Sequence, residues 1–374
     1  MNKAHHWLMI VITLVLLGGW VFFIPSHNNA GKTSSKVTAP EIKAIFNLKS
    51  TQEQGVELKK LLERVGPVET QEEMLASGLP FTGETHLLIH VIGDYIYDKY
   101  GLDGLPLCRE YFLSACYHGF IINALADHGL DGVATAMDKC AEAGGNIVAI
   151  QCAHAAGHGF VAWHDYDLLK ALKTCDELGS KVTNFGYFNC YDGVFMENIW
   201  GVHNGAPSEK RWIKDDNLYY PCNDPRIPEK YLNGCWSNQA TLMYQHFHGD
   251  LKKTAEACDA VENAGYRDTC YNNFSRQIHP LTEGQTTKVL SLCALATGEG
   301  RQNECTLINM TSYWSVGDHE LPFEICGAVS DSIKGECFSR LAGLIKYYYP
   351  NNPAERKSYC DKVTDKTSRQ ICAN

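Results

Sequence analysis

The chain has 374 residues, a formal net charge of −10 at pH 7 and 16 cysteines. An acidic balance without a cluster of basic residues argues against a nucleic-acid partner. A dense and even set of cysteines argues against a reducing compartment, where disulfides are rare. We therefore expect a disulfide-bonded protein that lies outside the cytoplasm, in the periplasm or the extracellular space.

The first 25 residues are predicted to form an uncleaved signal-anchor, a transmembrane helix. Lys3 precedes an uninterrupted apolar run from Trp7 to Ile24, which is at the short end of lengths that span a membrane. The run ends at Pro25 without the small-residue pattern of a signal-peptide cleavage site. The polar, mixed residues 26–50 are predicted to form a tether between this anchor and the folded domain.

Residues 51–83 are predicted to form short helices ahead of the main domain. Apolar residues recur at helical spacing from Val56 to Val65, where Gly66 and Pro67 end the pattern. A second short helix is expected near Gln71 to Leu75.

Residues 84–374 are predicted to form an all-α solenoid of about eight helical hairpins. The cysteines stand in eight successive pairs, whose second members recur every 32 to 45 residues. A period near 35 residues is typical of helical-hairpin repeats. Close pairs such as Cys-x2-Cys, which zinc clusters use, do not occur in the chain. The pattern favours one disulfide per repeat, formed between Cys108 and Cys116, Cys140 and Cys152, Cys175 and Cys190, Cys222 and Cys235, Cys258 and Cys270, Cys293 and Cys305, Cys326 and Cys337, and Cys360 and Cys372.

Such a disulfide would join the end of one helix to the start of the next. Closing a loop of about 10 to 15 residues contributes on the order of 3 kcal/mol in the chain-entropy account. The alternative is a disulfide within one hairpin, with Cys152 bonded to Cys175. The interval between Cys190 and Cys222 is longer than the others, and such insertions in solenoids tend to be loops on one face.

This cysteine pattern resembles that of secreted bacterial tetratricopeptide-like proteins whose helical hairpins are each stapled by a disulfide. The resemblance covers about residues 84–374 and rests on the repeat period and the cysteine pairing. It implies a stack of hairpins. The tetratricopeptide consensus of Trp, Gly, Tyr and Pro positions is not matched, so the resemblance implies no activity.

Five histidines occupy equivalent positions in three successive units. Glu84 stands in the first unit where the later units have their second cysteine, because the same interval separates Glu84 from Cys108 and Cys116 from Cys140. Counted from that slot, the histidines lie two or six positions on: His86, His90, His118, His154 and His158. Histidines at i and i+4 project from one face of a helix, one turn apart.

This histidine set predicts a metal site in the N-terminal half of the repeats. Imidazole ligands suit divalent zinc, copper, iron or nickel. A c-type haem is excluded because the chain lacks Cys-x-x-Cys-His, whereas non-covalent haem remains an alternative. Glu84, Asp192 and Glu197 are candidates for a general base beside a metal-bound water. Gly119, Gly157 and Gly159 are expected to let the helices approach closely.

Two questions stay open at this point. Packed helices lie 8–10 Å apart, so either strong curvature brings all five rings together, or two sites share His118. The position that holds His118, His154 and Asp192 is also compatible with plain hydrogen bonding between hairpins.

A metal-dependent enzyme or a metal carrier is the favoured function, because all five histidines precede residue 160. The alternative is a solenoid scaffold that binds a protein or peptide partner on its concave face.

Overall fold

The computed structural model describes residues 37–79, 83–201, 208–349 and 352–373. The predicted membrane anchor, residues 1–25, lies outside these ranges, as does the first part of the predicted tether. Within the described ranges, no helix combines the length and the apolar character that crossing a membrane requires. The regular elements described are all helical, as the sequence predicts.

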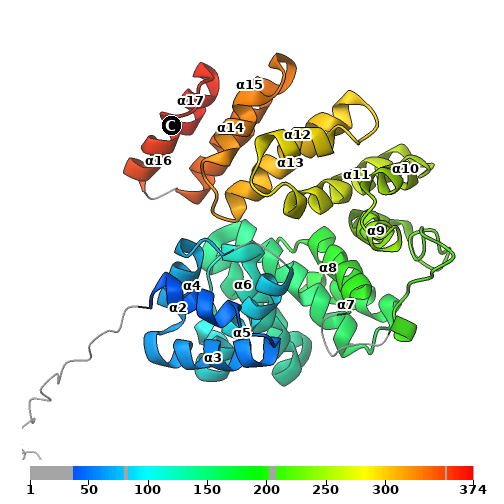
Figure 1. Ribbon diagram of the computed structural model, residues 1–374. Helices are drawn as coiled ribbons and strands as arrows, with labels where there is room; N and C mark the ends of the chain where they lie inside the picture. The colour runs from blue at the N-terminus through cyan, green and yellow to red at the C-terminus, as the bar shows by residue number, and fades with distance from the viewer. Residues whose placement is uncertain (1–36, 80–82, 202–207, 350–351, 374) are drawn as a thin grey trace, which may run out of the picture. The chain divides into compact units, whose positions relative to one another are not determined.

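Most of the helices follow one another with short connections (Figure 1), whereas the long connection between α8 and α9 contains two 3-10 turns, Ser208–Lys210 and Glu229–Tyr231. Their bounds are α2 Ala39–Phe46, α3 Thr51–Val65, α4 Pro67–Ala76, α5 Gly83–Tyr100, α6 Tyr111–Trp163, α7 Leu168–Lys181, α8 Tyr187–Trp200, α9 Leu232–His246, α10 Leu251–Asp259, α11 Ala264–Ile278, α12 Thr286–Cys293, α13 Glu299–Ser315, α14 Leu321–Ala328, α15 Asp331–Tyr348, α16 Pro353–Cys360 and α17 Lys366–Ala373.

The first helices differ in one respect from the sequence prediction. Residues 39–46 were expected to belong to the polar tether 26–50, yet they form α2 and bury Ile42 and Ile45. The pair of isoleucines lies on one face, three residues apart, which is enough to hold a short helix against the core. Helices α3 and α4 occupy the region where short helices are predicted, and the side chain of Ser50 caps α3 by accepting a hydrogen bond from the Glu53 N–H.

Helix α6 is folded back on itself. In a straight helix, Cys140 and Cys152 would lie about 18 Å apart, at 1.5 Å per residue. Their Cα atoms are 6.5 Å apart and their sulfurs are bonded. The reversals coincide with Gly129 and Gly145, whose φ angles of 60° and 65° suit glycine. We therefore divide α6 into a first limb (111–128), a middle limb (130–144) and a third limb (146–163).

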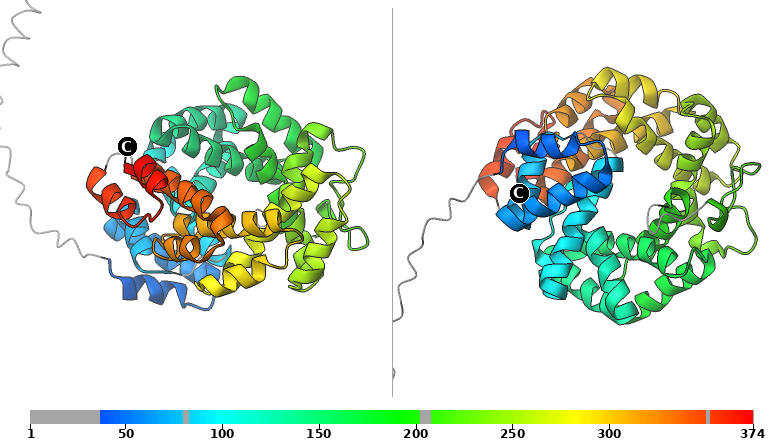
Figure 2. Two further views of the ribbon diagram at one scale, coloured as in Figure 1. Left: turned by 90° about the horizontal axis from the view of Figure 1, so that it is seen from above. Right: turned by 60° about the horizontal axis from the view of Figure 1, so that its bottom comes forward.

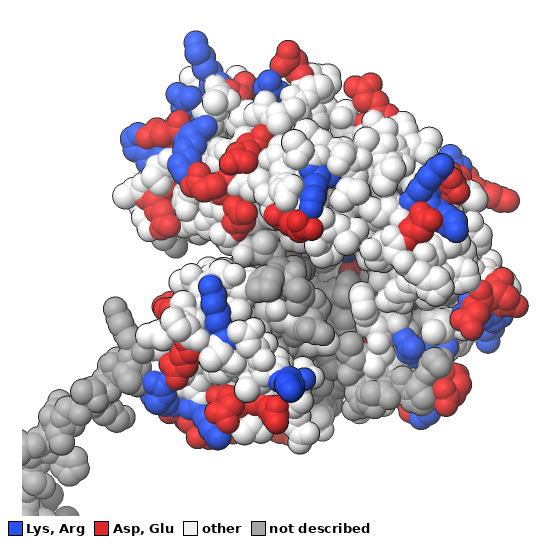
Figure 3. Space-filling model, viewed as in Figure 1, with Lys and Arg blue, Asp and Glu red and all other residues white. Residues whose placement is uncertain are grey.

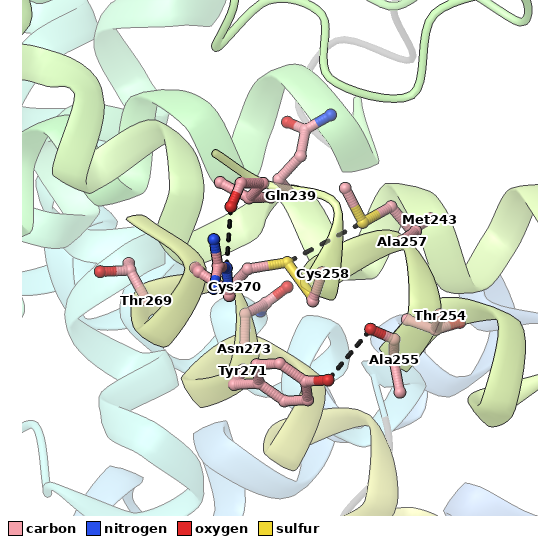
Figure 4. The surroundings of a disulfide bond; sticks show 12 residues. Gln239, Met243, Thr254, Ala255, Ala257, Cys258, Thr269, Cys270, Tyr271 and Asn273 are labelled. Carbon is pink, nitrogen blue, oxygen red and sulfur yellow. Dashed lines mark hydrogen bonds between the residues drawn. A yellow bond between two sulfur atoms is a disulfide. The ribbon is translucent and has the colours of Figure 1, made fainter. Parts of the chain in front are cut away.

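Eight disulfides connect the cysteines in the predicted order along the chain, so the inter-helix pairing is confirmed. Figure 4 shows the bond between Cys258 at the end of α10 and Cys270 in α11. Met243 packs on this bond, with its sulfur 3.9 Å from that of Cys270. Tyr271 donates a hydrogen bond to the Ala255 carbonyl at 3.1 Å, which fixes the same two helices beside the disulfide.

The repeats of residues 37–374 form two rows of helices. One row consists of α5, the first and third limbs of α6, α8, α9, α11, α13, α15 and α17, each packed on the next. Helices α7, α10, α12, α14 and α16 pack against this row from one side. The row is curved (Figure 2), and the Tyr347 hydroxyl of α15 donates to the carboxylate of Glu110, the residue just before α6, at 2.7 Å. Figure 3 shows acidic and basic side chains interspersed on the face viewed.

Candidate metal centre

The third limb of α6 and α8 touch backbone to backbone through two glycines. A Cβ atom on Gly157 would lie 2.1 Å from the carbonyl oxygen of Cys190. A Cβ atom on Gly193 would lie 2.1 Å from the carbonyl oxygen of His154. Any larger residue at either position would overlap the neighbouring backbone. The two helices are therefore closer than side chains normally allow, and polar groups on their facing sides come within hydrogen-bonding distance.

The contact between α5 and the first limb of α6 repeats this arrangement. A Cβ atom on Gly93 would lie 2.0 Å from the Cys116 carbonyl oxygen, and one on Gly119 would lie 2.1 Å from that of His90. Gly159 packs on the Leu125 side chain between the first and third limbs, where an added Cβ would lie at 3.0 Å. The expectation that glycines allow close helix contact is thus confirmed at Gly119 and Gly157, where the contact is with backbone.

The five predicted histidines form two triangles that share His118. In the first triangle the ring centroids of His86, His90 and His118 are 5.0, 5.0 and 5.1 Å apart. In the second, those of His118, His154 and His158 are 5.4, 5.3 and 4.8 Å apart. Two imidazoles bound to one tetrahedral ion with bonds of 2.0–2.1 Å have centroids about 5.2 Å apart. The ring centroids of both triangles lie near that spacing. Among the described residues, a group of three ligand atoms within 4.8 Å of one another occurs in the first triangle and not in the second.

The first triangle joins α5 to the first limb of α6. One nitrogen from each of His86, His90 and His118 can be chosen so that all lie within 4.8 Å of one another, and this group can hold a metal ion. His86 donates from Nδ1 to the Phe112 carbonyl at 2.9 Å, so its Nε2 carries a lone pair and faces Nδ1 of His118 at 3.2 Å. Burial, together with the neighbouring imidazoles, holds the pKa of His118 well below its ordinary value. Its ring is therefore neutral at pH 7, as a ligand must be.

The second triangle is flanked by two carboxylates from α8. Nδ1 of His154 lies 3.1 Å from an Asp192 oxygen, and Nδ1 of His158 lies 3.0 Å from Glu197 Oε2. The Nε2 atoms of the two histidines face each other at 3.1 Å. Ligand histidines in metalloproteins usually donate their other N–H to a carboxylate or a carbonyl. His154 and His158 have this arrangement.

The two carboxylates are fixed by further partners. Asp192 accepts hydrogen bonds from the Ser237 hydroxyl and, at 2.9 Å, from the Asn238 amide. Although burial alone would raise the pKa of Asp192, the hydrogen bonds from His154 and Ser237 and the positive charge of Arg276 outweigh it and lower that pKa. Glu197 is fully buried, and its second oxygen accepts from the Tyr166 hydroxyl at 2.6 Å. Burial and the Glu197 carboxylate raise the pKa of Tyr166, so this hydroxyl remains a donor.

The candidate general bases have different surroundings. Asp192 and Glu197 hold imidazoles, so the structure places them as partners of the predicted ligands. Glu84 belongs to α5, and its side chain lies outside what the structure describes. Sequence reasoning missed Tyr166, which comes from the turn after α6. The role of Ser237, two residues after Cys235, as a partner of Asp192 was not predicted from the sequence either.

Hydrogen bonding between hairpins, the plainer reading of this slot, is also present. The residues two positions after the second cysteine contact one another in successive helices. His154 contacts Asp192, and Asp192 accepts a hydrogen bond from the Ser237 hydroxyl. These contacts between successive helices explain why polar residues occur two positions after the cysteine. They do not account for the position six residues after the cysteine, where His90 and His158 complete the triangles.

Comparisons with protein-family models, with curated proteins and with solved structures find no match for this chain. The features of the molecule that point to a function are the geometry of the histidine cluster and the compartment that the disulfides indicate.

Proposed function

We propose that this protein is an extracytoplasmic helical-repeat protein, anchored in a membrane by residues 1–25, that binds a divalent transition metal in its N-terminal half. The observation that carries the proposal is the first triangle, in which nitrogens of His86, His90 and His118 lie within 4.8 Å of one another. His154 and His158 belong to the same cluster through their contact with His118. Eight disulfides and the absence of a free cysteine in the chain support an oxidising compartment.

The ligand type restricts the metal. A set of neutral imidazoles without thiolates suits zinc, copper or iron and disfavours magnesium and calcium, which prefer oxygen ligands. Ring nitrogens of His86 and His118 lie 3.2 Å apart, close to the separation of about 3.3 Å between two ligands of one tetrahedral ion. This favours a bare ion over non-covalent haem.

Such a centre supports either catalysis or metal carriage. If an ion is held by three imidazoles, a fourth position stays open for water or substrate, as in catalytic zinc sites. Carriage would use the same ligands and require exchange with a partner protein. We place a metal-dependent enzyme and a metal carrier together ahead of the solenoid scaffold. A scaffold that presents a concave face to a peptide needs no histidine triangle in one half of its repeats.

Metal analysis of untagged protein purified from an oxidising compartment tests the proposal. We expect at least one equivalent of zinc, copper or iron per chain, and a lower content when His86 and His90 are both replaced by Ala. The matched control replaces His246 and His248, an exposed pair near the end of α9, and should leave the content unchanged. Metal-free protein, or equal losses in the two double variants, would contradict the proposal and favour the scaffold.

A further inference from the structure

In the second triangle, the Nε2 atoms of His154 and His158 face each other, and their protonation has to be explained. If both Nδ1 atoms carry hydrogens and donate to Asp192 and Glu197, both Nε2 atoms are lone-pair acceptors. They nevertheless face each other at 3.1 Å. Two lone pairs at that distance repel unless a proton or a metal ion lies between them.

The surrounding charge favours a divalent ion. Asp192 is 7% exposed and Glu197 is 0% exposed, so the second triangle has two buried carboxylates. Buried charges are costly unless they are compensated. A shared proton would supply one positive charge and a divalent ion two. Arg276 adds to the positive potential at Asp192, while Glu197 is paired with the neutral hydroxyl of Tyr166.

His118 has a nitrogen for this second position. Its Nδ1 faces His86 at 3.2 Å, on the side of the first triangle. Its Nε2 is buried and makes no hydrogen bond within the part of the chain that the structure describes. An unsatisfied buried polar atom is unfavourable. Coordination of an ion by that nitrogen would satisfy it, and the ring centroids of His154 and His158 lie 5.4 and 5.3 Å from that of His118.

We propose that the centre is dinuclear: a second divalent transition-metal ion is bound by His154 and His158 through their Nε2 atoms, with His118 as the ligand shared with the first ion. To bind both ions, His118 releases its remaining N–H proton to solvent and bridges them as an imidazolate, with Nδ1 toward the first ion and Nε2 toward the second. Asp192 and Glu197 are positioning residues, which keep the hydrogens on Nδ1 and turn both Nε2 atoms toward the ion. The inference rests on the proposed function because His118 belongs to both triangles.

Zinc stoichiometry tests the dinuclear centre. The full chain, stripped with chelator under conditions that preserve the disulfides, is titrated with Zn²⁺ and dialysed, and bound zinc is measured by mass spectrometry. We expect two ions per chain, one after replacement of His154 and His158 by Ala, and one after replacement of His86 and His90. The His246/His248 double variant should keep both ions.

Asp192→Asn combined with Glu197→Gln provides a milder variant that keeps all five imidazoles. Outer partners of metal ligands typically contribute 10- to 100-fold in affinity. We expect the affinity for one of the two ions to fall about 10- to 100-fold, while the other keeps its wild-type affinity. Circular dichroism of each stripped variant checks that the helices remain.

The outcomes separate the two proposals. One zinc ion in the wild type that persists after replacement of His154 and His158 would overturn the second position and leave the proposed function intact. Such a result would mean that a shared proton separates the two Nε2 atoms. No bound zinc, copper or iron in the wild type would overturn both.

Discussion

Replacement of Gly157 by Ala tests whether the backbone contact between the third limb of α6 and α8 assembles the site. The new Cβ atom would lie 2.1 Å from the Cys190 carbonyl oxygen, which is backbone and not the end of a flexible side chain. Restoring an ordinary contact of about 3.0 Å or more requires the two helices to separate by about 0.9 Å. Forced overpacking of this kind typically costs about 1–3 kcal/mol.

The same displacement would break the polar pairs that cross the contact. The distance from His154 to Asp192 would rise from 3.1 Å to about 4.0 Å, and that from His158 to Glu197 from 3.0 Å to about 3.9 Å. Both lie beyond hydrogen-bonding range. Two buried carboxylates would lose a partner, at about 1–3 kcal/mol each. We expect Gly157→Ala to lower the free energy of unfolding by about 3 kcal/mol or more, and to weaken zinc binding at least 10-fold.

Urea denaturation of the oxidised, zinc-free protein and a zinc titration measure these two effects. Gly335→Ala in α15 is the matched control, because a Cβ atom there meets nothing within 4 Å. It should leave zinc binding unchanged and raise the free energy of unfolding by about 0.5–1 kcal/mol. Wild-type stability and zinc affinity in Gly157→Ala would refute the view that this contact holds the site together.

Three further predictions concern the frame around the site. Replacing Cys293 and Cys305 with Ala opens a 12-residue loop and should lower the free energy of unfolding by about 3 kcal/mol in urea denaturation, whereas no change would mean that this disulfide is dispensable. Burial lowers the pKa of His279 to about 4. Below pH 6.5 the unfolded chain therefore binds a proton that the folded chain excludes, and stability should fall by up to about 1.4 kcal/mol per pH unit down to pH 4. Urea denaturation between pH 7 and pH 4.5 should show a shallower fall in His279→Gln, and parallel curves would contradict the assignment. Tyr347→Phe removes the hydrogen bond between α15 and Glu110, the residue just before α6, and should cost about 1 kcal/mol in the same assay, whereas an unchanged unfolding midpoint would mean that the bond adds nothing.

The cysteine spacing was sufficient to predict the architecture because each disulfide is a local feature. Its two cysteines lie 8 to 15 residues apart and report the junction between consecutive helices directly. The reversals inside α6 had a weaker signal, since Gly129 and Gly145 are two of many glycines. Helix α2 was missed because only Ile42 and Ile45 bury it within an otherwise polar stretch.

The candidate site was predictable residue by residue but not as a geometry. Register along the repeats identified the five histidines, since equivalent positions of stacked helices share a face. Their convergence depends on backbone contacts through Gly119 and Gly157, which bring the helices closer than the usual 8–10 Å. The role of Tyr166 was hidden for another reason: it meets Glu197, 31 residues away, only after a turn and a helix have packed.

X-ray absorption spectroscopy at the zinc edge tests most directly whether imidazoles from consecutive hairpins bind metal. The zinc-loaded protein should show nitrogen neighbours at about 2.0–2.1 Å, together with the outer-shell scattering of imidazole rings. This ring scattering should weaken when His118 is replaced by Ala. An oxygen-only shell, or a spectrum that His118→Ala leaves unchanged, would contradict a metal centre built on these five histidines.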